Sequence, residues 1–149
     1  MIKRRLEELG IILPEVPKPV ASYIPAKIQE NLLYISGQLP LKDGKLLLTG
    51  ALKQESDVEI GKQAMEQCFI NSLAAASSVV DINQIKGILK LTAFVASTQD
   101  FVWQHLVANG ASELAFRIFG ESGKHVRSAV GVASLPLNAS VELEVIYIL

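Results

Sequence analysis

The most regular hydrophobic pattern lies in the middle of the chain, where apolar residues recur at close to helical spacing. They are Val58, Met65, Phe69, Leu73, Ala76 and Val80. Ser56, with Glu59 three positions later, forms a capping-box signature immediately before this run. The pattern predicts a long helix over about residues 57–80.

Three later segments have the patterns of strands. Residues 85–97 form a nearly continuous run of branched apolar residues, which is typical of a strand covered on both faces. Residues 126–134 and 140–148 alternate with a period of two, and a short turn containing Pro136 joins them. We therefore expect these last two strands to pair as a hairpin folded about position 137.

The first half of the chain predicts a strand meander. Residues 26–36 suggest two short strands that turn near positions 30 and 31. Residues 45–49 suggest a third strand, because they follow the Asp43-Gly44 turn signal.

A second helix is predicted in the second half of the chain. Asp100 is a suitable cap for it, and apolar residues at helical spacing continue to Phe119, before Gly120. The glycine after Asn109 is expected to interrupt this helix. The order of strands, helix, strand, helix and two strands indicates an α+β fold with helices on one side of a sheet.

The chain is long enough for one domain with a core of its own, because 149 residues with 50% hydrophobic content bury a substantial apolar interior. Residues 1–20 predict a short amphipathic helix that Gly10 ends, followed by an extended connector with Pro14, Pro17 and Pro19. Residues 21–149 are expected to form the single domain. The high hydrophobic content suggests apolar surface that is used in subunit contacts.

Composition also excludes several classes of partner and cofactor. A net charge of −1 gives no general attraction to nucleic acid or to a membrane surface, and no apolar run approaches the roughly 18 residues of a membrane helix. The N-terminus lacks a signal-peptide pattern and Cys68 is the single cysteine, so we expect a cytoplasmic protein. His105 and His125 lack metal-ligand spacing, and we expect neither a metal nor a cofactor.

Two charges stand in the apolar strands at the end of the chain. Arg127 shares a strand face with Ala129 and Gly131, and Glu142 shares one with Glu144. A charge in such a strand must reach solvent, find a partner charge or hold a ligand, because burying it alone is costly. These two residues are therefore the candidates for chemistry.

Four sequence elements form a recognisable set in the order Tyr-Ile-Ser-Gly-Gln-Leu-Pro at 34–40, Arg-Ser-Ala-Val at 127–130, Leu-Pro at 135–136 and Val-Glu-Leu-Glu at 141–144. Together they resemble the YjgF-type Rid family. The resemblance runs from about Tyr23 to the C-terminus. It implies a chorismate mutase-like fold, with a mixed β-sheet and two main helices packed on one face. It also implies a homotrimer with a ligand cleft between adjacent subunits.

The resemblance further implies an activity, since the best understood members hydrolyse reactive imines or enamines derived from amino acids, although older labels include endoribonuclease. Arg127 would then clamp the substrate carboxylate through two parallel hydrogen bonds. Its alternative role is a salt bridge with a carboxylate at a subunit contact. Glu142 matches the glutamate that positions water, and its alternative is a solvated residue on an exposed strand face.

Four further positions match the family's cleft. Tyr23 would cover an apolar ligand or donate from its hydroxyl, unless it is a core residue. Ser36 and Gly37 would offer a hydroxyl and an unobstructed backbone N–H to ligand oxygen, although a strand-end turn explains them nearly as well. Asn109 matches a cleft asparagine, but Asn-Gly is also an ordinary turn signal, which is the simpler interpretation.

The predicted hairpin has a consequence for the site. It pairs Arg127 with residue 147 and Glu142 with residue 132, an offset of five residues that corresponds to roughly 17 Å. A site that uses both side chains should therefore draw them from different protomers.

The chain also departs from the family pattern, because Ala129 and Gly131 stand where characterised members carry a cysteine and a glutamate. We therefore expect a divergent branch whose ligand is larger or different. The leading hypothesis is a hydrolytic deaminase of 2-aminoacrylate-like imines and enamines. The alternative is a non-catalytic trimer that binds a keto acid and acts in regulation, in which Glu142→Gln would leave affinity intact.

Overall fold

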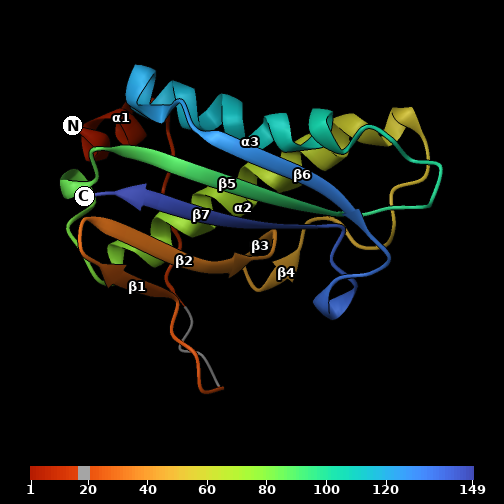
Figure 1. Ribbon diagram of the computed structural model, residues 1–149, viewed down its shortest axis with the longest axis horizontal. Coiled ribbons are helices and arrows are strands. Elements are labelled where there is room, and N and C mark those ends of the chain that lie inside the picture. The colour runs from red at the N-terminus through yellow and green to blue at the C-terminus, as the bar shows by residue number, and fades with distance from the viewer. Residues whose placement is uncertain (17–20) are drawn as a thin grey trace.

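A five-stranded mixed sheet with two long helices on one face forms the body of the protein (Figure 1). The computed structural model describes residues 1–16 and 21–149. The strands lie in the order β1-β2-β7-β5-β6, and only β5 and β6 are parallel. Their bounds are β1 Ala26–Gln29, β2 Leu32–Gln38, β5 Gly87–Ala96, β6 Val126–Val132 and β7 Val141–Ile148. The predicted α+β fold with a mixed sheet and two main helices is thus confirmed.

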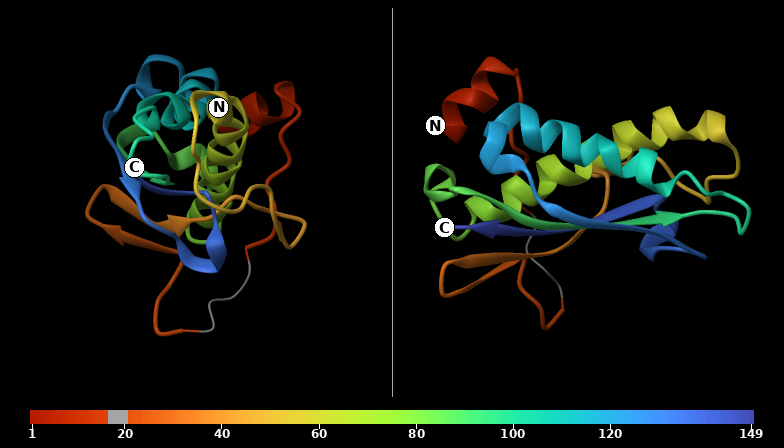
Figure 2. Two further views of the ribbon diagram at one scale, coloured as in Figure 1. Left: turned by 90° about the vertical axis from the view of Figure 1, so that its right-hand side faces the viewer. Right: turned by 45° about the horizontal axis from the view of Figure 1, so that its top comes forward.

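The two long helices, α2 (Val58–Ser77) and α3 (Gln104–Phe119), form one layer over the sheet (Figure 2). Alternate residues of the strands fill the space beneath them, and Leu91, Leu143 and Tyr147 have no or almost no exposed surface. The core therefore lies between one sheet face and the helices. Since β5, α3 and β6 follow one another in the chain and the two strands are parallel, they form a βαβ unit.

The N-terminal helix, predicted over residues 1–9, is α1 (Ile2–Glu8), and Gly10 follows it with a φ of 67°. Ile2 and Leu6 on one side of α1 are buried, and α1 packs against α3 and the short 3-10 helix Ile82–Gln84. Pro17 and Pro19 of the predicted connector lie outside the described residues. Apolar burial therefore holds α1 on the helix layer.

The predicted pairing of the last two strands as a hairpin is wrong, because β5 lies between β6 and β7. β5 pairs in parallel with β6 and antiparallel with β7. The segment between β6 and β7 crosses the end of β5 through a 3-10 turn, Pro136–Asn138, with positive φ at Leu137 and Asn138. The most apolar segment takes an inner position, where both of its edges are hydrogen bonded.

β5 was also expected to be covered on both faces, and within this chain only one is covered. Leu91, Ala93 and Val95 are buried beneath the helices, whereas Thr92 and Phe94 on the other face are half-buried. The reason is that α2 and α3 lie on the same side of the sheet (Figure 2). The uncovered face also carries exposed Tyr34 and Val130.

α3 is continuous, so the expected interruption after Asn109 is wrong. Gly110 is helical, and α2 passes very close to it. A Cβ at this position would overlap the backbone carbonyl of Lys62. The helix begins at Gln104 rather than at a cap by Asp100, whose carboxylate instead accepts from the Thr98 hydroxyl.

The long helix predicted over residues 57–80 is confirmed as α2, but its start differs from the predicted capping box. The 3-10 turn Glu55–Asp57 precedes it, and the Asp57 carboxylate accepts the backbone N–H groups of Lys53 and Gln54. A carboxylate one residue beyond Ser56 thus binds two backbone N–H groups of the segment just before the helical turn.

The predicted meander is confirmed for its first two strands, β1 and β2, which turn at Glu30 with a φ of 55°. The third strand is shorter than predicted. β3 (Leu41–Lys42) and β4 (Lys45–Leu46) form a separate two-stranded hairpin around Asp43 and Gly44, both with positive φ.

Candidate functional site

Arg127 lies on the edge strand β6 and points towards α3. Its register partner in β5 is Leu91, which is fully buried on the helix side, so the two side chains share that face. Nη1 donates to Asn109 Oδ1 at 2.9 Å and to Ser112 Oγ at 3.0 Å, and Nη2 donates to the carbonyl of His105 at 3.2 Å. Three oxygens from one helix thus hold the guanidinium.

Helical spacing places these three acceptors together. His105, Asn109 and Ser112 are four and three residues apart, so they lie one above another on the same side of α3. Because α3 runs without a break through Gly110, Asn109 is part of a helix and not of the turn favoured by the sequence. The structure therefore brings the predicted Arg127 and Asn109 into direct contact.

The partners of Arg127 are all neutral oxygens. Within residues 1–16 and 21–149, none of the salt bridges involves Arg127. Three of its five N–H donors are used in the contacts above, and the other two have no acceptor among the residues that the structure describes. Burial lowers the pKa of the Arg127 guanidinium, because the positive charge loses water without gaining an anion. This arrangement is suited to binding a carboxylate.

His125 connects to the Arg127 guanidinium through Ser112. From the sequence it was a candidate only for metal binding. Ser112 Oγ lies 2.9 Å from His125 Nε2, and His125 Nδ1 lies 2.6 Å from the carbonyl oxygen of Gly123. Two sequence signals were available. His125 immediately precedes β6 and lies two residues before Arg127, and Asn109 and Ser112 are one helical turn apart.

Glu142 lies on β7 and points to the face of the sheet that the helices leave uncovered. It is half-buried, and its register partner in β5 is Phe94 on the same face. Its carboxylate lies over Gly37, where a Cβ would overlap Oε1. Burial, and then the nearby Glu144 carboxylate, raise the pKa of Glu142. A carboxylate with these properties is suited to accept a proton or hold a water molecule.

Tyr23 and Ser36 line an open depression of about 470 Å³ on the β1 and β2 side of the protein. Tyr23 is 59% exposed, so it is not the core residue that was its alternative role. The Ser36 hydroxyl donates to the carbonyl of Ile24 at 2.6 Å, which leaves its oxygen able to accept but occupies its proton. Next to it, β2 shifts register between Ile35 and Gln38, so Gly37 lies outside the regular ladder with β7.

The predicted residues thus fall into two groups. Arg127 and Asn109 form a guanidinium cradle between α3 and β6, together with Ser112 and the His105 carbonyl. The second group, Tyr23, Ser36, Gly37 and Glu142, lies on β2, β7 and the segment before β1. The register places Arg127 and Glu142 three residues apart along β5 and two strand spacings apart across the sheet, which together give roughly 14 Å. The two side chains also lie on opposite faces of the sheet.

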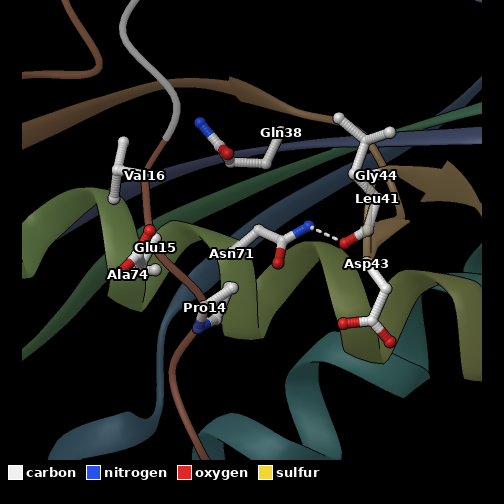
Figure 3. A pocket seen from close by; sticks show the side chains of 9 residues that line it. All are labelled: Pro14, Glu15, Val16, Gln38, Leu41, Asp43, Gly44, Asn71 and Ala74. Atoms are coloured by element: carbon white, nitrogen blue, oxygen red, sulfur yellow. Dashed lines mark hydrogen bonds between the residues drawn. The ribbon is translucent and has the colours of Figure 1, made fainter.

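A separate cavity of about 380 Å³ lies between the N-terminal connector and α2 (Figure 3). Pro14, Glu15 and Val16 form one wall of it, and Asp43 and Gly44 the opposite side. Asn71 donates to the carbonyl of Leu41 at its floor. The residues that line this cavity include neither Arg127 nor Glu142, so it is distinct from both groups.

Two further features, a metal-binding cluster and a membrane-spanning helix, are absent from the described part of the chain. It contains no group of three or more His, Cys, Asp or Glu residues arranged to hold a metal ion. None of the helices in residues 1–16 and 21–149 has the length and apolar character needed to cross a membrane.

Comparison with known proteins places the chain among relatives of the same length. Protein TCP17 of Trypanosoma cruzi is 37% identical over 145 residues, which cover 96% of this chain and 91% of the relative. A 2-iminobutanoate/2-iminopropanoate deaminase of Dermatophagoides farinae is 30% identical over 142 residues and covers 93% and 94% of the two chains. A crystal structure of a protein with unknown function from Agrobacterium tumefaciens is 46% identical, with a TM-score of 0.88 over 99% of this chain and 92% of that one.

The sequence pattern that defines the family described as "YjgF/chorismate_mutase-like, putative endoribonuclease" matches residues 3–149. The match includes α1 and therefore begins earlier than the resemblance seen from Tyr23 onward. With the fold, the family pattern and the relatives in agreement, the chain belongs to the YjgF/chorismate mutase-like family.

Proposed function

We propose that the protein is a hydrolytic deaminase of small imines and enamines that carry a carboxylate, such as 2-aminoacrylate. The observation that carries this proposal is the guanidinium cradle. Arg127 is held by neutral oxygens and keeps two N–H donors for a ligand. A relative that is 30% identical and is named a 2-iminobutanoate/2-iminopropanoate deaminase supports the same class of substrate.

In the proposed reaction Arg127 holds the substrate carboxylate and so fixes the position of the imine carbon. Glu142 accepts a hydrogen bond from a water molecule and directs its oxygen at that carbon. The water adds across the C=N bond, the resulting carbinolamine loses ammonia, and a 2-oxo acid remains. An enamine enters the same route after it takes a proton at its terminal carbon and becomes the imine.

Such imines also hydrolyse spontaneously, so the protein needs to supply only proximity and one proton acceptor. The raised pKa of the Glu142 carboxyl favours this role, because a more basic carboxylate accepts a proton more readily. The proton that Glu142 takes from water returns to the amine nitrogen as ammonia leaves, and the proton that an enamine needs comes from solvent.

The active assembly is proposed to be a homotrimer in which each cleft takes Arg127 from one subunit and Glu142 from its neighbour. Two observations support this. The two side chains lie on opposite faces of one sheet, so they cannot hold a small ligand together within one chain. The uncovered sheet face carries exposed Tyr34, Val126 and Val130, which would gain by burial against another subunit.

The test uses freshly generated 2-aminoacrylate with the wild-type protein and with Arg127→Ala. We expect the wild type to release ammonia faster than buffer and Arg127→Ala to release it at close to the buffer rate. Equal rates for wild type, variant and buffer would overturn the proposal. Saturable binding of a 2-oxo acid by the wild type, without turnover of any imine, would instead identify a binding protein.

A further inference from the structure

His125 is connected to the guanidinium cradle by a continuous series of hydrogen bonds. The series runs from the Gly123 carbonyl to His125, then to the Ser112 hydroxyl and finally to Arg127, with donor to acceptor distances of 2.6, 2.9 and 3.0 Å. All members come from the βαβ unit and the turn before β6. The series therefore links a backbone carbonyl to the group proposed to bind substrate.

When the His125 ring is neutral, the chemistry of the end groups sets the direction of every bond in this series. A carbonyl oxygen only accepts, so Nδ1 of His125 carries the hydrogen. In the neutral ring Nε2 is then an acceptor, and it takes the proton of the Ser112 hydroxyl. This orients the lone pairs of Ser112 Oγ towards Arg127, whose Nη1 donates to it. Without His125 the hydroxyl would be free to rotate, and its lone pairs would no longer be held towards Nη1 of Arg127.

We propose that His125, acting through Ser112, is a positioning residue for Arg127 that fixes the guanidinium in the orientation needed to bind the substrate carboxylate. The inference rests on the proposed function for its kinetic readout, but it also makes a claim about binding alone. His125 touches no ligand in this scheme. Its effect passes entirely through the Ser112 hydroxyl, which also distinguishes it from a residue needed only for folding.

Substitutions of His125 and Ser112 can test this proposal, because each removes a known donor or acceptor from the series. His125→Leu removes the acceptor for Ser112, whereas His125→Gln offers a side-chain oxygen near the position of Nε2. Ser112→Ala removes the hydroxyl, and the double variant removes both. Ser77→Ala is the matched control, because Ser77 is an exposed helical serine whose hydroxyl donates only to the Ala74 carbonyl of its own helix.

We expect His125→Leu and Ser112→Ala each to raise KM for 2-iminobutanoate by about three- to tenfold with little change in kcat. His125→Leu removes the acceptor that orients the Ser112 hydroxyl, and Ser112→Ala removes the oxygen that holds Nη1 of Arg127. His125→Gln should restore most of the wild-type KM, and Ser77→Ala should match the wild type. The double variant should be no worse than Ser112→Ala alone. Losses that add, or an unchanged KM in a folded His125→Leu protein, would overturn the proposal.

Direct binding separates this inference from the proposed function. Titration of the full-length protein with 2-oxobutanoate, by calorimetry, should give the same order of affinities as the KM values. If the wild type hydrolyses no imine, the proposed function fails, and the calorimetric order still decides the role of His125. The imidazole ¹⁵N chemical shifts of the unliganded protein supply a further check, because a hydrogen on Nε2 and none on Nδ1 would contradict the series.

Discussion

Arg127 and Glu142 lie on opposite faces of one sheet, on the two strands that flank β5. Arg127 shares its face with the buried Leu91, and Glu142 shares the other face with Phe94. If one ligand contacts both side chains, they must belong to different copies of the chain. The oligomer is then required for the reaction itself.

Mixed oligomers test this requirement. Arg127→Ala and Glu142→Gln subunits should each be inactive alone, whereas equal amounts refolded together should regain about one quarter of wild-type activity. In a cyclic trimer one site in four would combine an intact arginine with an intact glutamate from its neighbour. The measurement is ammonia release by the refolded mixture. A mixture as inactive as its two components would show that the site lies within one subunit.

Arg127→Lys tests whether the planar guanidinium is needed. We expect KM to rise by about tenfold or more, because a lysine ammonium cannot contact Asn109 and Ser112 and still present two parallel donors to a carboxylate. Arg117→Lys is the control, since Arg117 forms an exposed pair with Glu66 at 3.5 Å. Steady-state kinetics decide the matter, and equal KM values for both variants would count against the cradle.

Substitution of Gly37 tests the place of the Glu142 carboxylate. A Cβ at this position would overlap Oε1 of Glu142, which lies at the end of a flexible side chain and can move away. Gly37→Ala should therefore lower kcat while the free energy of unfolding changes by less than about 1 kcal/mol. In a Glu142→Gln background the same substitution should cause no further loss of kcat. A large loss of stability would show that Gly37 has a structural role instead.

The pH dependence of activity should report the Glu142 carboxyl. Burial and then Glu144 raise its pKa, and its proposed role needs the deprotonated form. Activity should therefore rise with pH through a value above the ordinary glutamate range. Initial rates between pH 4 and 8 measure this, after subtraction of the spontaneous rate. Glu144→Gln should move the midpoint down, and an unmoved midpoint would assign the titration to another group.

The same carboxyl should affect stability in the opposite direction. Because its pKa is higher in the folded chain, the folded state binds more protons than the unfolded chain between the two values. Stability should thus fall as pH rises through this window. Glu142→Gln should be slightly more stable than the wild type at pH 7, by less than about 1 kcal/mol because the group is half exposed. Urea unfolding at pH 4 and pH 7 would measure the difference.

Packing between the two long helices gives a further prediction. A Cβ at Gly110 would overlap the backbone carbonyl of Lys62, which cannot rotate away. Gly110→Ala should cost about 1 to 3 kcal/mol of stability. Gly61→Ala is the comparison, because its Cβ would meet only the side chains of Leu52 and Val107. Thermal unfolding should place Gly110→Ala clearly below Gly61→Ala, and the reverse order would be inconsistent with this packing.

The sequence predicted which face of a strand each residue occupies better than it predicted which strands lie side by side. Period-two alternation placed Arg127 with Ala129 and Glu142 with Glu144 correctly, because it depends only on local geometry. The insertion of β5 between β6 and β7 was missed, since a short proline-containing link fits a hairpin and a crossover equally well.

The candidate site was predictable to a similar extent. Asn109 was identified through the family resemblance, yet local turn chemistry favoured the simpler interpretation. The close approach of α2 gives another reason for a glycine at position 110, and this tertiary contact cannot be read from the sequence. Ser112 and His125 were missed because their contacts join a helix to a strand. Periodicity shows which face a residue occupies but not what meets that face.

The βαβ unit has a consequence for how ligand preference can change. Everything that grips the guanidinium comes from one uninterrupted stretch, residues 87–127. Tyr23, Ser36 and Gly37, by contrast, are encoded far upstream. In the proposed cleft, substitutions in that upstream stretch would therefore change which ligands fit, while the contacts that hold Arg127 would stay unchanged.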